Sequence, residues 1–213
     1  MPRSSTFVLF ALVGALVLTG CAADEPAPTT ASDSATETPT PTAPSDSATE
    51  APATPSTAAV PTDCATVVDA ATYAATFGET PLNDPALDYP DGLGAVAPTS
   101  PTAGASTDET ITSGIELRCI WRDPGADISF LLLEAGHVTP EAAQARLDQL
   151  AAEGYTCADQ LDGRQCQLVR PNEQYPVDEA DTQFVRDDVL IRVQQANVPT
   201  SGLMAAVVAR IWG

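Results

Sequence analysis

Hydrophobic and polar positions divide the chain into three stretches with different patterns. Residues 7–18 are an uninterrupted apolar run, residues 22–62 contain one Val and no aromatic residue, and from Asp63 onward apolar residues recur at regular spacing. A segment made almost wholly of Ala, Pro, Thr, Ser, Asp and Glu cannot bury enough apolar area to offset the entropy lost on ordering. We therefore expect a disordered tether over residues 21–62 and one folded domain over residues 63–213.

The apolar spacing within residues 63–213 predicts helices packed on a sheet. Apolar residues at helical spacing predict one helix over residues 64–77 and a second from Pro140 to a stop at Gly154. A third helix is predicted at the C-terminus, where Leu203, Val207 and Ile211 form one apolar stripe. Alternating or fully apolar runs predict strands over residues 115–122, 128–135, 155–158, 165–170, 182–185 and 189–193. This order implies an α+β fold in which three helices pack on an antiparallel sheet of five to six strands.

One long stretch, residues 79–112, is rich in Pro, Gly, Asp and Thr and has no clear period. Irregular connections of this length are often functional. We take Leu87, Tyr89, Leu93 and Val96, together with Trp121 on the following strand, as candidate ligand-binding residues that line or cover a pocket against the sheet. The alternative is a packed loop without a ligand.

The four residues Leu18-Thr19-Gly20-Cys21 close the apolar run, which is too short to span a membrane. They resemble the lipobox of bacterial lipoproteins at all four positions. The resemblance implies that residues 1–20 are a signal peptide and that Cys21 is the lipidated mature N-terminus, which places the protein on the outer face of the cytoplasmic membrane. The alternative is cleavage at another position, with Cys21 incidental.

The four remaining cysteines predict two disulfides, because an exported domain meets an oxidising environment. Three pairings are open. Cys157 and Cys166 flank Asp162-Gly163, a turn signal that places them opposite each other on neighbouring strands. This spacing favours Cys157–Cys166, which leaves Cys64–Cys119. A zinc site would need Cys-x-x-Cys spacing, which the chain lacks.

The net charge and the motifs of the chain argue against several classes of function. The net charge of -20 argues against binding to nucleic acid, which needs a positive face. His137 is the only histidine and no Gly-x-Ser-x-Gly motif occurs, so we identify no catalytic residue, metal ligand or cofactor site. We interpret the acidic clusters Asp178-Glu179-Ala-Asp181 and Asp187-Asp188 as solvated, with calcium binding and a paired-carboxylate hydrolase as the alternatives.

Several motifs of the folded domain are similar to secreted actinobacterial lipoproteins of unknown function. These are Asp63-Cys64, Cys119-Ile-Trp121, Gly154-Tyr-Thr-Cys157 and Arg186-Asp187. The resemblance implies a lipid-tethered, disulfide-linked domain that acts by binding. We expect the ligand to be a small molecule, a lipid or an envelope component. The alternative hypothesis is a domain that docks on an envelope protein, and the third is an extracellular hydrolase.

Overall fold

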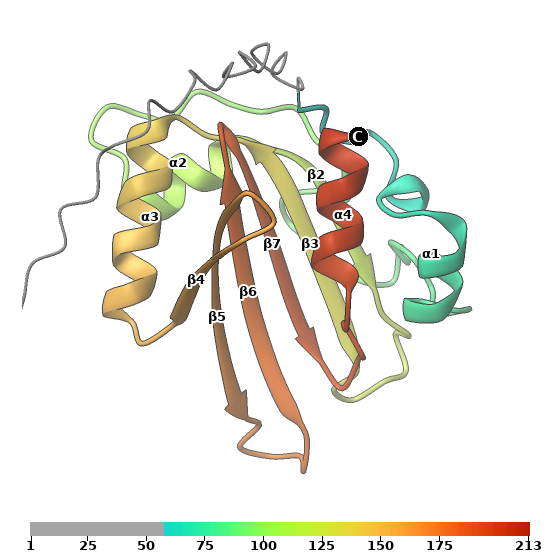
Figure 1. The fold of residues 1–213 in the computed structure, drawn as a ribbon. Helices are drawn as coiled ribbons and strands as arrows, with labels where there is room; N and C mark the ends of the chain where they lie inside the picture. Colours follow the sequence, from blue (N-terminus) through green and yellow to red (C-terminus); the bar gives the residue numbers. More distant parts are fainter. Residues whose placement is uncertain (1–57) are drawn as a thin grey trace, which may run out of the picture. The chain divides into compact units, whose positions relative to one another are not determined.

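Seven strands form one antiparallel sheet in the order β1-β2-β3-β7-β6-β5-β4 in the computed structural model, which describes residues 58–213 (Figure 1). The predicted signal peptide, Cys21 and nearly all of the predicted tether lie outside these residues. The strands are β1 (Gly94–Ala95), β2 (Ile115–Trp121), β3 (Phe130–His137), β4 (Thr156–Gln160), β5 (Gly163–Pro171), β6 (Asp178–Arg186) and β7 (Val189–Ala196).

The helices lie on both faces of this sheet (Figure 1). They are the 3-10 helix η1 (Cys64–Thr66) and the α-helices α1 (Ala70–Thr76), α2 (Thr107–Ser113), α3 (Pro140–Ala152) and α4 (Leu203–Trp212). The predicted α+β class is therefore confirmed, with one strand more than the upper estimate. The extra strand, β1, is a two-residue pairing of the irregular stretch with β2.

The first predicted helix is interrupted. The Asp63 side chain accepts a hydrogen bond from the Ala65 amide and caps η1, and the Asp69 side chain accepts from the amides of Ala71 and Thr72 and caps α1. Asp favours such capping over the interior of a helix, so a second helix begins at residue 70 instead of the first continuing. The predicted single helix over residues 64–77 was wrong in this respect.

One helix lies inside the stretch that sequence analysis left irregular. In α2, the Ser106 side chain accepts a hydrogen bond from the Glu109 amide, while the Glu109 carboxylate accepts one from the Ser106 amide. This reciprocal pair is a capping box. The spacing Ser106-x-x-Glu109 indicates a helix start in the sequence. With only seven residues, α2 is too short to show a clear apolar period.

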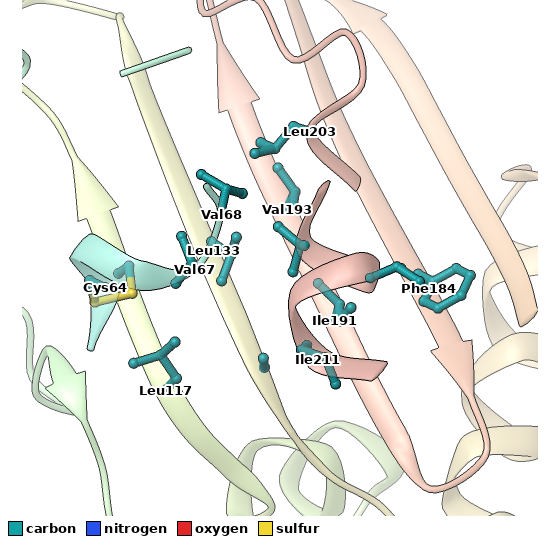
Figure 2. Packing of buried hydrophobic residues seen from close by; sticks show 14 of the residues in the cluster. Cys64, Val67, Val68, Leu117, Leu133, Phe184, Ile191, Val193, Leu203 and Ile211 are labelled. Carbon is teal, nitrogen blue, oxygen red and sulfur yellow. A yellow bond between two sulfur atoms is a disulfide. The ribbon is translucent and has the colours of Figure 1, made fainter. Parts of the chain in front are cut away.

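The larger core covers what we call the α4 face of the sheet. On this face, Leu117, Leu133 and Ile191 of β2, β3 and β7 are packed beneath α4 and η1 (Figure 2). Leu203, Val207 and Ile211 of α4 are nearly fully buried, as the predicted stripe requires. Trp121 belongs to this core and stacks on Phe77 with ring centroids 3.9 Å apart.

The opposite face, which we call the α3 face, has a smaller apolar core. Ile111 of α2 and Ala143 of α3 pack against Val185 and Leu190 of the sheet. The α3 helix starts as predicted, with Thr139 accepting a hydrogen bond from the Ala142 amide. Beyond the C-terminal end of α3, strands β5 and β6 continue without a helix over them (Figure 1).

Both predicted disulfides are present. Cys64–Cys119 joins η1 to β2, and Cys157–Cys166 joins two directly opposite residues of β4 and β5. The turn between β4 and β5 is Leu161-Asp162, one residue before the expected Asp162-Gly163. This two-residue turn fixes the register that places Cys157 opposite Cys166. Among the described helices, none is long and apolar enough to cross a membrane.

Candidate functional site

A row of alternating charges crosses the α3 face through four strands. Arg118 of β2 donates through Nε to Glu134 Oε1 of β3 at 2.7 Å. Arg192 of β7 lies directly opposite Glu134, and it donates through Nη2 to Asp181 Oδ2 of β6 at 2.7 Å. The antiparallel register brings these four residues together, because each occupies the same face of its strand.

The row continues from the sheet into the helices above it. Asp181 Oδ1 accepts from the Gln183 amide at 3.2 Å, and Gln183 Oε1 accepts from Arg146 Nε of α3 at 2.8 Å. Arg146 in turn donates to Asp108 of α2 at 2.7 Å. These bonds fix α2 and α3 to one end of the row.

The irregular stretch covers the other end of the row. Arg118 donates through Nη1 to the Asp91 carbonyl at 3.0 Å, and its guanidinium lies 5.5 Å from the centre of the Tyr89 ring. Burial and the charge of Glu134 raise the pKa of Tyr89, so its hydroxyl keeps its proton at neutral pH. Arg118 is therefore enclosed and structural, with only 4% of its side chain exposed.

Arg192, in contrast, is held in place and still reaches solvent. Burial opposes its charge, but the hydrogen bonds and charge of Asp181, with the charge of Glu134, raise its pKa overall. Its side chain is 30% exposed, and its Nη1 lies 3.9 Å from Glu134 Oε2, which is longer than a hydrogen bond. Arg192 thus offers donors to a ligand from a fixed position.

A groove of about 390 Å³ lies over Arg192 where α3 no longer covers the sheet. Tyr155, in the connection from α3 to β4, forms one side, and burial together with the charge of Asp181 raises its pKa. Arg170 of β5 and Glu179 of β6 form an ion pair in the groove at 3.3 Å. The lining residues are Phe130, Tyr155, Leu168, Arg170, Glu179, Ala180, Asp181, Arg192, Gln194 and Gln195.

The structure does not bring the five candidate ligand-binding residues into one site. Trp121 lies in the core of the α4 face, whereas Tyr89 packs on Arg118 of the α3 face. Val96 lines a smaller hollow of about 180 Å³ together with Arg118. Leu87 and Leu93 are half-buried in the irregular stretch. Ligand binding by these residues stays a prediction, and the larger groove lies elsewhere.

Sequence reasoning missed the charged row, although a signal was present. Glu134 and Arg192 interrupt the apolar runs LLLEAG and LIRV, and Arg118 lies among apolar residues in LRCIW. A charged residue is almost never buried unless it is paired, so a charge inside an apolar strand points to a partner on a neighbouring strand. Which strands are neighbours follows only from the topology, which places β7 between β3 and β6.

Within residues 58–213 no group of three His, Cys, Asp or Glu side chains is arranged to hold a metal ion. His137 pairs with one carboxylate, with its Nδ1 2.6 Å from Glu116 Oε1. No protein-family model matches the chain, and a comparison with curated proteins also gives no match. The interpretation of the groove therefore rests on its own geometry and chemistry.

Proposed function

We propose that this protein is a lipid-anchored extracytoplasmic binding protein whose domain holds a small molecule in the groove over Arg192. The lipobox Leu18-Thr19-Gly20-Cys21 supports the anchor, with acyl chains on Cys21 placing the protein at the outer face of the cytoplasmic membrane. The partners are then the membrane, through Cys21, and a ligand from the envelope. The chain's negative charge argues against nucleic acid.

The observation that carries the binding role is a fixed, partly exposed Arg192 at the floor of a groove. Small-molecule sites are concave, and a few polar groups held in place by neighbours orient the ligand. Asp181 and Glu134 hold Arg192 from two sides. The volume of about 390 Å³ lies within the range of about 300–1,000 Å³ found for ligand pockets.

Two other roles receive less support from the described residues. A docking surface for an envelope protein calls for a contiguous exposed apolar patch. Only Leu161 and Val169 are large hydrophobic residues with high exposure in this part of the chain. A carboxylate hydrolase calls for an acid free to transfer a proton, whereas Asp181 accepts from Arg192 and Glu179 accepts from Arg170.

Two adjacent substitutions on β5 test the binding role. Leu168 lines the groove, and Val169 points to the opposite face with 54% of its surface exposed. Leu168→Trp fills the groove, and Val169→Trp adds the same ring outside it. The full chain is extracted from its own membrane with a mild detergent, and its native and denatured masses are compared.

We expect a small-molecule adduct in the native mass of the wild type and of Val169→Trp, and its loss in Leu168→Trp. Circular dichroism and the melting temperature show whether both variants are folded. If Leu168→Trp does not fold, Gln194→Trp, on the neighbouring floor, takes its place. An adduct that persists in the filled groove contradicts the proposal, and so does the absence of any adduct when no ligand added in solution binds either.

A further inference from the structure

The charges in the groove are already neutralised within the protein. Arg192 is paired with Asp181 and Glu134, and Arg170 is paired with Glu179. A charged ligand would have to displace one of these partners and leave it without compensation. An anion would in addition approach a chain with a net charge of -20. The groove is therefore matched to a neutral ligand.

The polar groups of the groove retain unused donors and acceptors. Among the described residues, the Tyr155 hydroxyl has no hydrogen-bond partner. Gln194 donates its amide to Asp181 at 2.9 Å, which turns the amide oxygen away from that bond and leaves it as an acceptor. Arg192 Nη1 supplies donors beside them, beyond hydrogen-bond distance of Glu134.

Donors and acceptors so close together suit a ligand whose groups both donate and accept. A hydroxyl group does this, whereas a carboxylate only accepts and an ammonium only donates. The raised pKa of Tyr155 keeps its own hydroxyl protonated at neutral pH, so that it can act in either way. Several hydroxyl groups on one ligand would use all three positions together.

Apolar surface accompanies these polar groups. Phe130 and Leu168 line the same groove as Arg192 and Gln194, and the ring of Tyr155 borders it. A sugar ring has hydroxyl groups around its edge and a face of C–H groups, which packs against aromatic and aliphatic side chains. The groove volume of about 390 Å³ accommodates a small ligand or the end of a longer chain.

We infer that the groove over Arg192 binds a neutral carbohydrate, either a free sugar or the terminal unit of an envelope glycan. This inference rests on the proposed binding function and specifies its ligand class. Tyr155, Gln194 and Arg192 bond the hydroxyl groups, and Phe130 and Leu168 contact the C–H face of the ring.

The test uses the full chain in a sugar-free detergent and matched probes. The neutral probes are the methyl glycosides of glucose, mannose, galactose and arabinose. Glucuronate and glucosamine carry a charge on a comparable ring, and octanoate represents an acyl chain. Saturation-transfer NMR detects binding, and titration calorimetry gives the dissociation constant. A glycan-terminal role is separated from a free-sugar role by adding oligosaccharides released from the same envelope.

We expect binding of at least one neutral glycoside. Tyr155→Phe removes one hydroxyl and no internal hydrogen bond, and we expect it to raise the dissociation constant roughly three- to tenfold, the effect of one hydrogen bond. Tyr175→Phe is the matched control, since Tyr175 is outside the groove lining, and we expect no change.

Two outcomes overturn this inference and distinguish it from the proposed function. If only glucuronate, glucosamine or octanoate binds, or if the native adduct has a mass and fragmentation that are not those of a saccharide, the ligand class is wrong and the binding role remains. If no probe binds and no native adduct is found, both the ligand class and the binding role fail.

Discussion

Glu134 is the residue on which the charged row depends most. It lies between Arg118 and Arg192, and its side chain is only 10% exposed. A buried carboxylate that compensates a buried guanidinium adds little net stability, but its loss leaves that guanidinium without a partner. Arg118 is the more sensitive of the two neighbours because it has almost no access to water.

We expect Glu134→Gln to lower the free energy of unfolding by about 3–5 kcal/mol, the typical cost of breaking a buried ion pair. Urea denaturation followed by circular dichroism measures it. Asp159→Asn is the control, because Asp159 and Arg164 form an exposed pair whose loss changes stability by at most about 1 kcal/mol. Equal effects of the two substitutions on the free energy of unfolding would show that a buried pair in this row costs no more to break than an exposed pair.

The start of α2 gives a second prediction at this scale. Hydrogen bonds from the Ser106 backbone and side chain hold the pKa of Glu109 below its ordinary value of 4.5. A group whose pKa is lowered on folding stabilises the fold above its unfolded pKa. This contribution is lost as the pH falls through the lowered folded pKa.

We therefore expect Ser106→Ala to raise the pKa of Glu109 toward 4.5, measured by NMR titration of the side-chain carboxyl carbon. Thr139→Ala removes the corresponding cap of α3 and serves as the control, with no effect on Glu109. The backbone hydrogen bond from residue 106 remains in this variant, so the rise is partial. A pKa of Glu109 that does not respond would mean that the Ser106 hydroxyl does not bond to Glu109 in solution.

Among the elements, the predicted strand positions match the structure, and β5, β6 and β7 are longer than expected. The apolar runs of β2 and β3 predicted their positions closely. β6 extends over Asp178–Arg186, whereas only residues 182–185 were expected. The missing part contains Glu179 and Asp181, which are typical of loops by their own propensity. Their backbones pair with β5 and β7, and their side chains pair with Arg170 and Arg192. The expectation of a solvated acidic cluster was wrong for Asp181, whose side chain is 15% exposed.

The two disulfides give a prediction about how elements are held together. They close loops with sequence separations of 55 and 9 residues. In the chain-entropy account, the longer loop contributes about 4 kcal/mol and the shorter about 2.5 kcal/mol, because a crosslink restricts the unfolded chain more when its loop is longer.

We expect the double substitution Cys64→Ala/Cys119→Ala to destabilise the domain more than Cys157→Ala/Cys166→Ala, by roughly 1.5 kcal/mol at the least. The difference increases further because Cys64 and Cys119 are both buried in the larger core. Denaturation in urea without reductant measures the free energy of unfolding of both double variants. The reverse order would indicate that restraint of the β4–β5 hairpin matters more than loop length.

At the scale of the whole molecule, the proposed role depends on one modification and one groove. Acyl chains contribute membrane affinity of about 0.8 kcal/mol per buried CH₂, so two or more chains on Cys21 anchor the protein stably. The proposed function requires that this anchor and the binding groove belong to the same mature protein.

We expect Cys21→Ala to move the protein from the membrane fraction to the soluble fraction, with the thermal stability of its folded domain unchanged. Fractionation followed by immunodetection measures the location, and the intact mass of the wild type shows whether acyl chains start at Cys21. Cys157→Ala/Cys166→Ala is the control, since it removes two cysteines that lie outside the proposed lipobox. An unchanged membrane fraction for Cys21→Ala would contradict the lipoprotein assignment.

The amino-acid sequence was sufficient to predict the fold class and most element positions, and it favoured the disulfide pairing that the structure has. Each of these follows from local information: apolar period, caps and turns, and the short spacing between Cys157 and Cys166. It also predicts the anchor at Cys21, whose motif is four consecutive residues.

The positions at which the residues of the charged row meet follow only from the tertiary structure. Arg118, Glu134, Asp181 and Arg192 come from four strands, and the order β2-β3-β7-β6 brings them onto one face. It also placed Trp121 and Tyr89, both expected to line one pocket, on opposite faces of the sheet. Side chains alternate between faces, so a shift of one residue in register exchanges the two faces, and no local pattern specifies which strands become neighbours.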